Sequence, residues 1–509
     1  MSMDVRFVDT TFRDGSQSLW ASGMRTGMVE AVAEAVGRTG FSAVEAPLAG
    51  VFLKKFVRDL KENPWDLARM VARKMPDTVK ACMAGPKLNP FGVQSPKAVA
   101  KLFYERIAVI GGLNRVQMFA NTFGQMQNEF PWTIPMFRNL GFQVAIALSY
   151  TISPRHSDEY YAQKTHAAIA FKPDVVYLED QCGILTLDRA RTLLPAIMKI
   201  ANGLPVELHA HCTTGLAPLV YLEALQLGIR TLHTAIPPLA EGPSQPSIFN
   251  IARNARLMRY SPSVDEKMLE PVKQRLTAIA RQERLPIGAP IEYDYAQYIH
   301  QMPGGVISNL KHQLAQVRIE HRPEEVLEES VLVRKDLGYP IMVTRHSQFV
   351  GTQAAINVAT GERYKLVIDE LILFAQGVYT EDSGYTWMDQ NLKDRLLSTP
   401  RAKELEEMTA RQQTDVPLHR LREKFGGPGV SDEELVLRYV MHGEQEVAAM
   451  HTAGPARRYH GTSLPLVTLL RELDKHARVS YVHVKRGGDS LLVRRRSPDL
   501  GRATSAEMH

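Results

Sequence analysis

Two histidines, His209 and His211, are the residues of this sequence that most directly suggest chemistry. They lie two residues apart in the stretch VELHAH, which is typical of a β-strand, and residues two apart on a strand point to the same side. Two carboxylates could complete a site: Asp14, which follows the apolar stretch VRFVDTT, and Glu179, near the end of VVYLED. Two imidazoles with carboxylates suit Zn²⁺, Mn²⁺ or a similar divalent ion. Taken alone, such a histidine pair is more often two unrelated polar residues facing solvent. Whether the two imidazoles are metal ligands therefore depends on the fold around them.

The first half of the chain alternates short apolar stretches with stretches of helical spacing. Eight strands are predicted, at residues 5–11, 41–47, 78–84, 114–120, 143–150, 174–180, 205–211 and 230–236. Eight strands that alternate with helices predict an α/β fold, a (β/α)8 TIM barrel. A doubly wound sheet is the alternative, and the lack of a GxGxxG motif after the first strand weighs slightly against it.

A barrel would bring the four ligand candidates together. Asp14 follows the first predicted strand, Glu179 ends the sixth, and the two histidines end the seventh. The C-terminal ends of barrel strands surround one centre, which is where active sites of this fold lie. Because a buried polar group needs a partner, the alternative role of Glu179 and its neighbour Asp180 is an ion pair with a barrel arginine.

The pattern changes after about residue 260, where helical spacing prevails. We expect residues 1–300 to form the catalytic barrel, residues 301–450 a helical domain that completes the active site, and residues 451–509 a small C-terminal extension of one helix and one hairpin. The extension is basic, but neither an aromatic platform nor a known binding motif accompanies the charge. We therefore expect a solvated surface there and no nucleic-acid partner.

Composition narrows the class of protein. The 509 residues are 44% apolar, enough for two or three domains. The three cysteines, Cys82, Cys182 and Cys212, are few and unpatterned, which argues against a disulfide framework and for a reducing compartment. The N-terminal stretch lacks the features of a signal peptide, and no apolar run is long enough to span a membrane. We therefore expect a cytoplasmic protein.

Seven stretches follow one another in a specific order: VDTTFRDGSQSLWASGMRT, LSYTISPRHSDEYY, HAHCTTGLA, TAIPPLAEGPSQPS, MPGGVISNLK, VTRHSQFVGTQAA and LREKFGGPGVSDEELVLRYVM. Together they resemble the carboxyltransferases of biotin-dependent enzymes that act on 2-oxo acids. This family includes the carboxyltransferase domain of pyruvate carboxylase, the alpha subunit of oxaloacetate decarboxylase and the pyruvate-side subunit of transcarboxylase. The resemblance covers roughly residues 5 to 450, and it implies a metal-centred TIM barrel followed by a helical domain.

The resemblance also implies roles for individual residues. Asp14 and the two histidines of VELHAH fall on the metal ligands of the family. Arg13 and Gln17 fall on positions that contact the substrate. Thr344 falls on the catalytic threonine that passes a proton between biotin and the 2-oxo acid.

The chain departs from the family at five positions. Glu179 stands where the family has a lysine that CO2 carbamylates for metal binding. A glutamate supplies a carboxylate without modification, but its side chain is shorter than a carbamylated lysine by about three bonds. We therefore expect Glu179 to bind the metal directly or through a bridging water. Ala84 stands where an arginine clamps the carboxylate of pyruvate, so we expect a different acceptor. Gln117 and Ala120 replace an arginine and an aspartate, and Cys212 replaces an aspartate.

Three functions remain open. The first is a carboxyltransferase subunit that moves a carboxyl group, through an enolate, between biotin and an acceptor other than pyruvate. No Met-Lys-Met turn for biotin attachment occurs, so the biotin would be attached to a separate carrier protein. The second is a biotin-independent metal-dependent decarboxylase or carbon–carbon lyase. The third is a non-catalytic assembly subunit, against which the retained metal ligands argue.

The cofactor and partners that these functions imply are few. We expect one divalent metal, Zn²⁺ or Mn²⁺, and a small-molecule carbonyl or carboxylic acid substrate. The expected protein partners are a biotin carrier, a biotin carboxylase subunit and a second copy of this chain in a homodimer.

Overall fold

The computed structural model describes residues 3–88, 95–303, 322–379, 387–410, 416–459, 469–470, 472–473, 475–476, 478–486 and 489–494, apart from the side chains of residues 344, 345, 486 and 489. By its internal contacts the chain divides into two compact units, residues 1–457 and 458–509. The first unit holds the barrel and the helices that follow it. The second holds a hairpin.

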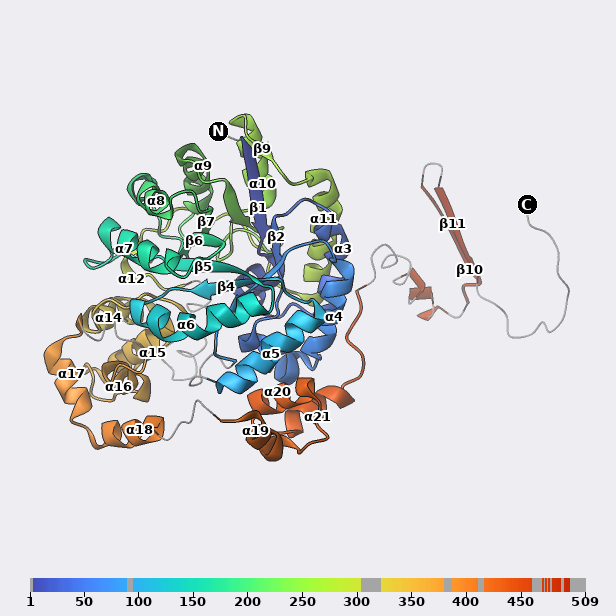
Figure 1. Cartoon of the computed structure of the whole chain (residues 1–509). Helices are drawn as coiled ribbons and strands as arrows, with labels where there is room; N and C mark the ends of the chain where they lie inside the picture. The colour runs from blue at the N-terminus through green and yellow to red at the C-terminus, as the bar shows by residue number, and fades with distance from the viewer. Residues whose placement is uncertain are drawn as a thin grey trace. The chain divides into compact units, whose positions relative to one another are not determined.

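Eight parallel strands form a closed barrel, as the alternating pattern predicted (Figure 1). They are β1 (Asp4–Asp9), β2 (Ala43–Glu45), β3 (Lys80–Ala84), β4 (Arg115–Phe119), β5 (Gln143–Ser149), β6 (Val175–Asp180), β7 (Val206–Ala210) and β8 (Thr231–Thr234). The barrel closes because β1 pairs with both β2 and β8, with Val8 opposite Ala43 and His233. A short ninth strand, β9 (Ser261–Pro262), pairs with the start of β1. The doubly wound alternative is therefore wrong.

Helices lie between the strands and around the barrel (Figure 1). They are η1 (Thr11–Gly15), α1 (Ser16–Trp20), α2 (Thr26–Glu30), α3 (Ala33–Gly37), η2 (Gly50–Phe52), η3 (Lys55–Leu60), α4 (Pro64–Lys74), α5 (Lys97–Ile110), α6 (Phe123–Asn139), α7 (Asp158–Ile169), α8 (Leu187–Ala201), α9 (Ala217–Leu227), α10 (Ile248–Leu257), α11 (Glu266–Glu283) and α12 (Ala296–His300).

The segment from β6 to α8 shows how the sequence sets these elements. The run VVYLED is buried on both faces, which suits a strand enclosed by helices. Gly183 then turns the chain with φ of +63°, and a side chain there would collide with Thr213 and with the backbone carbonyl of His211. Thr186 caps the next helix by accepting a hydrogen bond from the backbone N–H of Arg189. The glycine therefore lets this turn pack directly against the loop that carries His211.

From residue 322 to residue 457 the described elements are all helices, as predicted. They are α14 (Pro323–Asp336), α15 (Thr344–Thr360), α16 (Asp369–Ala375), α17 (Gln390–Leu397), α18 (Pro400–Ala410), α19 (Leu418–Phe425), α20 (Asp432–Met441) and α21 (Gln445–Thr452). Arg334 of α14 ties this region to the barrel by donating to the hydroxyl of Thr151 and the carbonyl of Ile152, just after β5. The helical region therefore contacts the barrel at the end where the strands finish.

The second unit contains an antiparallel hairpin of β10 (Tyr481–Arg486) and β11 (Asp489–Arg494), where a hairpin was predicted. Among the residues that the structure describes, no helix has both the length and the apolar character needed to cross a membrane.

Candidate metal centre

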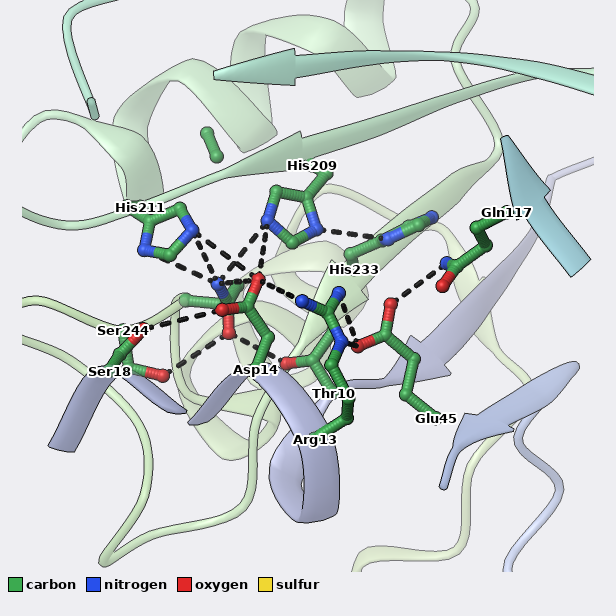
Figure 2. Close-up of polar contacts among 12 residues, drawn as sticks. Thr10, Arg13, Asp14, Ser18, Glu45, Gln117, His209, His211, His233 and Ser244 are labelled. Atoms are coloured by element: carbon green, nitrogen blue, oxygen red, sulfur yellow. Dashed lines mark hydrogen bonds and ion pairs between the residues drawn. The ribbon is translucent and has the colours of Figure 1, made fainter. Parts of the chain in front are cut away.

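Asp14, His209 and His211 meet at the C-terminal end of the barrel (Figure 2). Asp14 lies on η1, directly after β1, whereas the histidines lie on β7 and just beyond it. The carboxylate oxygen Oδ2 of Asp14 is 3.1 Å from Nε2 of His209 and 3.4 Å from Nε2 of His211. One ligand atom from each residue lies within 4.8 Å of the other two, and all three residues are buried. The structure thus brings together three of the four predicted ligands.

Gln245, in the loop after β8, directs its amide into the centre of this group. Its Nε2 is 3.1 Å from Oδ2 of Asp14, 3.3 Å from Nε2 of His209 and 3.0 Å from Nε2 of His211. Its Oε1 accepts a hydrogen bond of 2.8 Å from the hydroxyl of Thr10, which fixes the amide with its nitrogen inward. Three electron-pair donors therefore point at one position, and an amide with two hydrogens satisfies at most two of them. This donor set fits a divalent cation.

The second nitrogen of His211 fixes its tautomer. Nδ1 lies 2.7 Å from the carbonyl oxygen of Pro243, which can only accept, so Nδ1 carries the proton and Nε2 presents its lone pair to the centre. Burial opposes the charged imidazole, but the Asp14 carboxylate outweighs it and raises the pKa of His211. Burial dominates at His209 and lowers its pKa to about 4. For Asp14, burial is outweighed by Arg13 and His211, which hold its pKa well below the ordinary value.

Arg13 lies beside the centre, where a substrate-contacting residue was predicted (Figure 2). Its Nε and one terminal nitrogen are 2.8 Å and 2.7 Å from Oε2 of Glu45, and the other terminal nitrogen is 3.4 Å from Oδ2 of Asp14. Gln117 holds the opposite oxygen of Glu45 at 2.8 Å. The guanidinium is therefore fixed by Glu45, a partner that the sequence analysis did not identify. Gln17, the other predicted contact, has a buried Oε1 that accepts no hydrogen bond within the described part of the chain.

Glu179 and Asp180 are neighbours with different surroundings. Asp180 accepts hydrogen bonds from the backbone N–H groups of Ile184, at 3.0 Å, and Leu185, at 2.7 Å, so it stabilises the turn after β6. Glu179 is 6% exposed, and its Oε2 has no hydrogen-bond partner among the described residues. Burial raises its pKa to about 8, against the influence of Arg13. The structure shows no ion pair between Glu179 and any described arginine, and its role as a ligand stays a prediction.

Three of the remaining predicted positions lie at or just after the C-terminal ends of barrel strands. Ala84 ends β3 and Ala120 follows β4, while Cys212 is buried directly after the second histidine. Thr344 begins α15, but its side chain lies outside the described ones.

Two family models match the chain. The model described as HMGL-like matches residues 4–275, and the one described as conserved carboxylase domain matches residues 298–486. The first match ends at residue 275 and the second begins at residue 298.

Curated relatives are carboxylase subunits. A pyruvate carboxylase subunit of Methanocaldococcus jannaschii is 33% identical over 74% of this chain and 65% of its own length. The 2-oxoglutarate carboxylase large subunit of Hydrogenobacter thermophilus is 30% identical over 75% of this chain and 58% of its own length. The chain thus spans less than two thirds of these relatives. Among solved structures, the carboxyl transferase domain of Rhizobium etli pyruvate carboxylase (variant Y628A, with pyruvate) matches 97% of this chain and 85% of its own, with TM-score 0.78 and 21% identity.

Proposed function

Because the chain belongs to the HMGL-like family, we propose that it is a metal-dependent carboxyltransferase subunit that moves a carboxyl group between carrier-bound biotin and a carbonyl-containing acceptor. The resemblance found in the sequence is confirmed, since its relatives are carboxylase and carboxyltransferase subunits, which are enzymes. The observation that carries the proposal is the convergence of Asp14, His209 and His211 on one position at the C-terminal end of a barrel.

The side chains at this centre have complementary tasks. Asp14 and the two histidines would hold the divalent ion, Zn²⁺ or Mn²⁺, and the bound ion would supply Lewis-acid chemistry toward a carbonyl oxygen. Arg13, fixed by Glu45, places a positive charge next to the position where negative charge develops on the acceptor. The buried Oε1 of Gln17 accepts a hydrogen bond from a bound group. Thr344 remains the predicted carrier of the proton between the acceptor and biotin.

The acceptor is a compound other than pyruvate. Ala84 ends β3 at the edge of the site, and its methyl group cannot form the two parallel hydrogen bonds by which an arginine binds a small carboxylate. One relative is named a 2-oxoglutarate carboxylase and another a pyruvate carboxylase, so the acceptor in the name differs among similar proteins. A larger carbonyl acid can use contacts further out on the barrel rim.

We also propose the assembly around this site. Residues 1–300 carry the catalytic groups, residues 301–450 complete the active site, and a separate carrier protein brings biotin. A biotin carboxylase subunit and a second copy of the chain are the further partners.

Metal content and biotin-linked activity test the proposal together. The purified protein is expected to bind one divalent ion per chain, and His209→Ala is expected to lose it. His166→Ala, which changes an exposed histidine on α7, is the matched control and is expected to keep it. Decarboxylation of a panel of carboxylated 2-oxo acids, with and without biocytin, then identifies the acceptor. Metal binding that survives His209→Ala, or the absence of any biotin-stimulated turnover, would overturn the proposal.

A second candidate is a biotin-independent decarboxylase or carbon–carbon lyase. It is favoured by Glu179, which is buried. Its Oε2 accepts no hydrogen bond from the described residues, and burial raises its pKa to about 8. A group with these properties suits general acid–base catalysis near neutral pH. Turnover that needs the metal and Glu179 but does not respond to biocytin would select this function.

A further inference from the structure

A second cluster of buried polar side chains lies deeper in the barrel than the metal centre. Its members are Arg115 on β4, Glu207 and His209 on β7, and His233 on β8, each at most 4% exposed. Only His209 belongs to the site proposed above. Buried charges and imidazoles inside a barrel cost free energy unless they are paired, so this cluster requires an explanation.

The four side chains form one continuous line of contacts. Arg115 holds Glu207 through two N···O contacts, of 3.2 Å and 2.6 Å. Oε2 of Glu207 is 2.9 Å from Nε2 of His233. Nδ1 of His233 is 3.2 Å from Nδ1 of His209, whose other nitrogen faces Asp14 (Figure 2).

The direction of these hydrogen bonds follows from the groups that can only accept or only donate. A guanidinium only donates, so Glu207 accepts from it as a carboxylate. A carboxylate in turn accepts from His233, which places a proton on Nε2 of that imidazole. In a neutral imidazole the other nitrogen is then an acceptor. Nδ1 of His233 therefore accepts from Nδ1–H of His209, and Nε2 of His209 is left with its lone pair toward the metal position.

We propose that His233 is a positioning residue that holds His209 in the tautomer able to bind the metal, with Glu207 and Arg115 fixing His233 in turn. The inference rests on the metal centre of the proposed function. It assigns to three residues of this chain a role toward that centre without making any of them a ligand.

The ring of His233 is also fixed by packing. Its centroid is 5.1 Å from that of Tyr177 on β6, with 31° between the planes, and 5.2 Å from that of His209. The tyrosine covers one side of the ring, so His233 has little freedom to turn away from His209. Hydrogen bonding and packing therefore favour the same orientation.

A second metal ion is the competing interpretation, since one atom each of Glu45, His209 and His233 also lie within 4.8 Å of one another. The carboxylate of Glu45 already binds the guanidinium of Arg13 at 2.7 Å and the amide of Gln117 at 2.8 Å. Both oxygens of Glu45 therefore already accept hydrogen bonds, which a cation at this position would have to displace. The geometry therefore favours a hydrogen-bonded support for one metal over two metals that share His209.

Metal affinity of the full-length protein tests the role of His233. Zn²⁺ affinity, measured against a competing chelator, is expected to fall about 10–100-fold in His233→Leu, the usual effect of removing a partner of a metal-bound histidine. His233→Gln can accept from His209 and donate to Glu207, so it is expected to bind Zn²⁺ more tightly than His233→Leu. Tyr177→Phe keeps the packing ring and is the matched control, with unchanged affinity. Three results would overturn the proposal. The parent and His233→Leu could bind Zn²⁺ with equal affinity, the leucine and glutamine variants could be weakened equally, or the chain could bind two Zn²⁺ ions.

The nitrogen NMR shifts of histidines labelled with ¹⁵N supply a readout that does not need metal. In the parent, His209 is expected to carry its proton on Nδ1, and in His233→Leu this preference is expected to be lost. If the parent binds no Zn²⁺ but shows this tautomer, the proposed metal function fails while the positioning by His233 stands. If the proton of His209 is on Nε2 in the parent, the positioning proposal itself is overturned.

Discussion

Replacement of Asp9 by asparagine tests the cost of the carboxyl groups that crowd the end of the barrel. Asp9 is the last residue of β1 and is fully buried. Its Oδ1 accepts hydrogen bonds from the backbone N–H and the hydroxyl of Thr11, whereas its Oδ2 has no partner within the described residues. Burial raises the pKa of Asp9 to about 7, from an ordinary 3.8, and the nearby Glu45 adds to this rise.

The sign of the pH dependence follows from this raised pKa. The folded chain binds the proton of Asp9 more tightly than the unfolded chain does, so the stability it contributes is complete below about pH 4 and lost as the pH rises to about 7. The difference between the folded and unfolded pKa values corresponds to about 4 kcal/mol in the free energy of unfolding. About 3 kcal/mol of this stability is lost between pH 5 and the folded pKa. With an unfolding entropy of about 1 kcal/mol/K for a unit of this size, that amounts to about 3 °C in Tm.

Thermal unfolding of the parent and Asp9→Asn at pH 5 and pH 8.5 measures the effect. Asparagine keeps the acceptor for Thr11 but cannot ionise, so the Tm of the variant relative to the parent is expected to rise by about 3 °C between the two pH values. Asp188→Asn removes a carboxylate that is 95% exposed on α8 and is the matched control, with no such rise. A Tm difference between Asp9→Asn and the parent that stays constant with pH would refute the reasoning.

Three further outcomes follow from the site. Glu179→Gln is expected to weaken metal binding about 10–100-fold, and equal affinity in the variant and the parent would show that Glu179 is not a ligand. Metal occupancy of the parent is expected not to change when bicarbonate is removed, since a glutamate needs no CO2. Turnover of pyruvate is expected to stay below a kcat/KM of about 10⁴ M⁻¹s⁻¹ and to increase in Ala84→Arg, and a higher parent value would contradict the assigned acceptor class. Asp180→Ala is expected to destabilise the fold by about 2 kcal/mol or more in chemical unfolding, because two buried backbone N–H groups lose their acceptor; an unchanged midpoint would count against that role.

The strands and the convergence of Asp14, His209 and His211 could be predicted because both follow from local pattern. Alternation of strands and helices leaves few folds, and in a barrel the ends of β1, β6 and β7 must lie near one another. His209 and His211 then converge from their spacing alone. The different surroundings of Glu179 and Asp180 could not be predicted from the strand pattern, because which of two neighbours faces the barrel interior depends on the register of the whole strand.

The supporting residues could not be predicted in the same way. Glu207 lies two positions before His209 on the same strand, which was an available signal, but its partners come from β4 and β8. Gln245 lies in a loop, where no periodicity constrains the direction of a side chain. Contacts of this kind depend on tertiary distances between segments far apart in the chain, and the sequence pattern contains no measure of those distances.

The ion pair between Arg115 and Glu207 also determines where molecules can enter and leave. Both residues lie near the starts of their strands, and their contact crosses the inside of the barrel from β4 to β7. Side chains fill the interior of such a barrel, and this pair, only 5% exposed at each side chain, seals the end opposite the metal centre. Under the proposed function, a reactant therefore reaches the metal centre from the end of the barrel where the strands finish, and not through the end that this ion pair occupies.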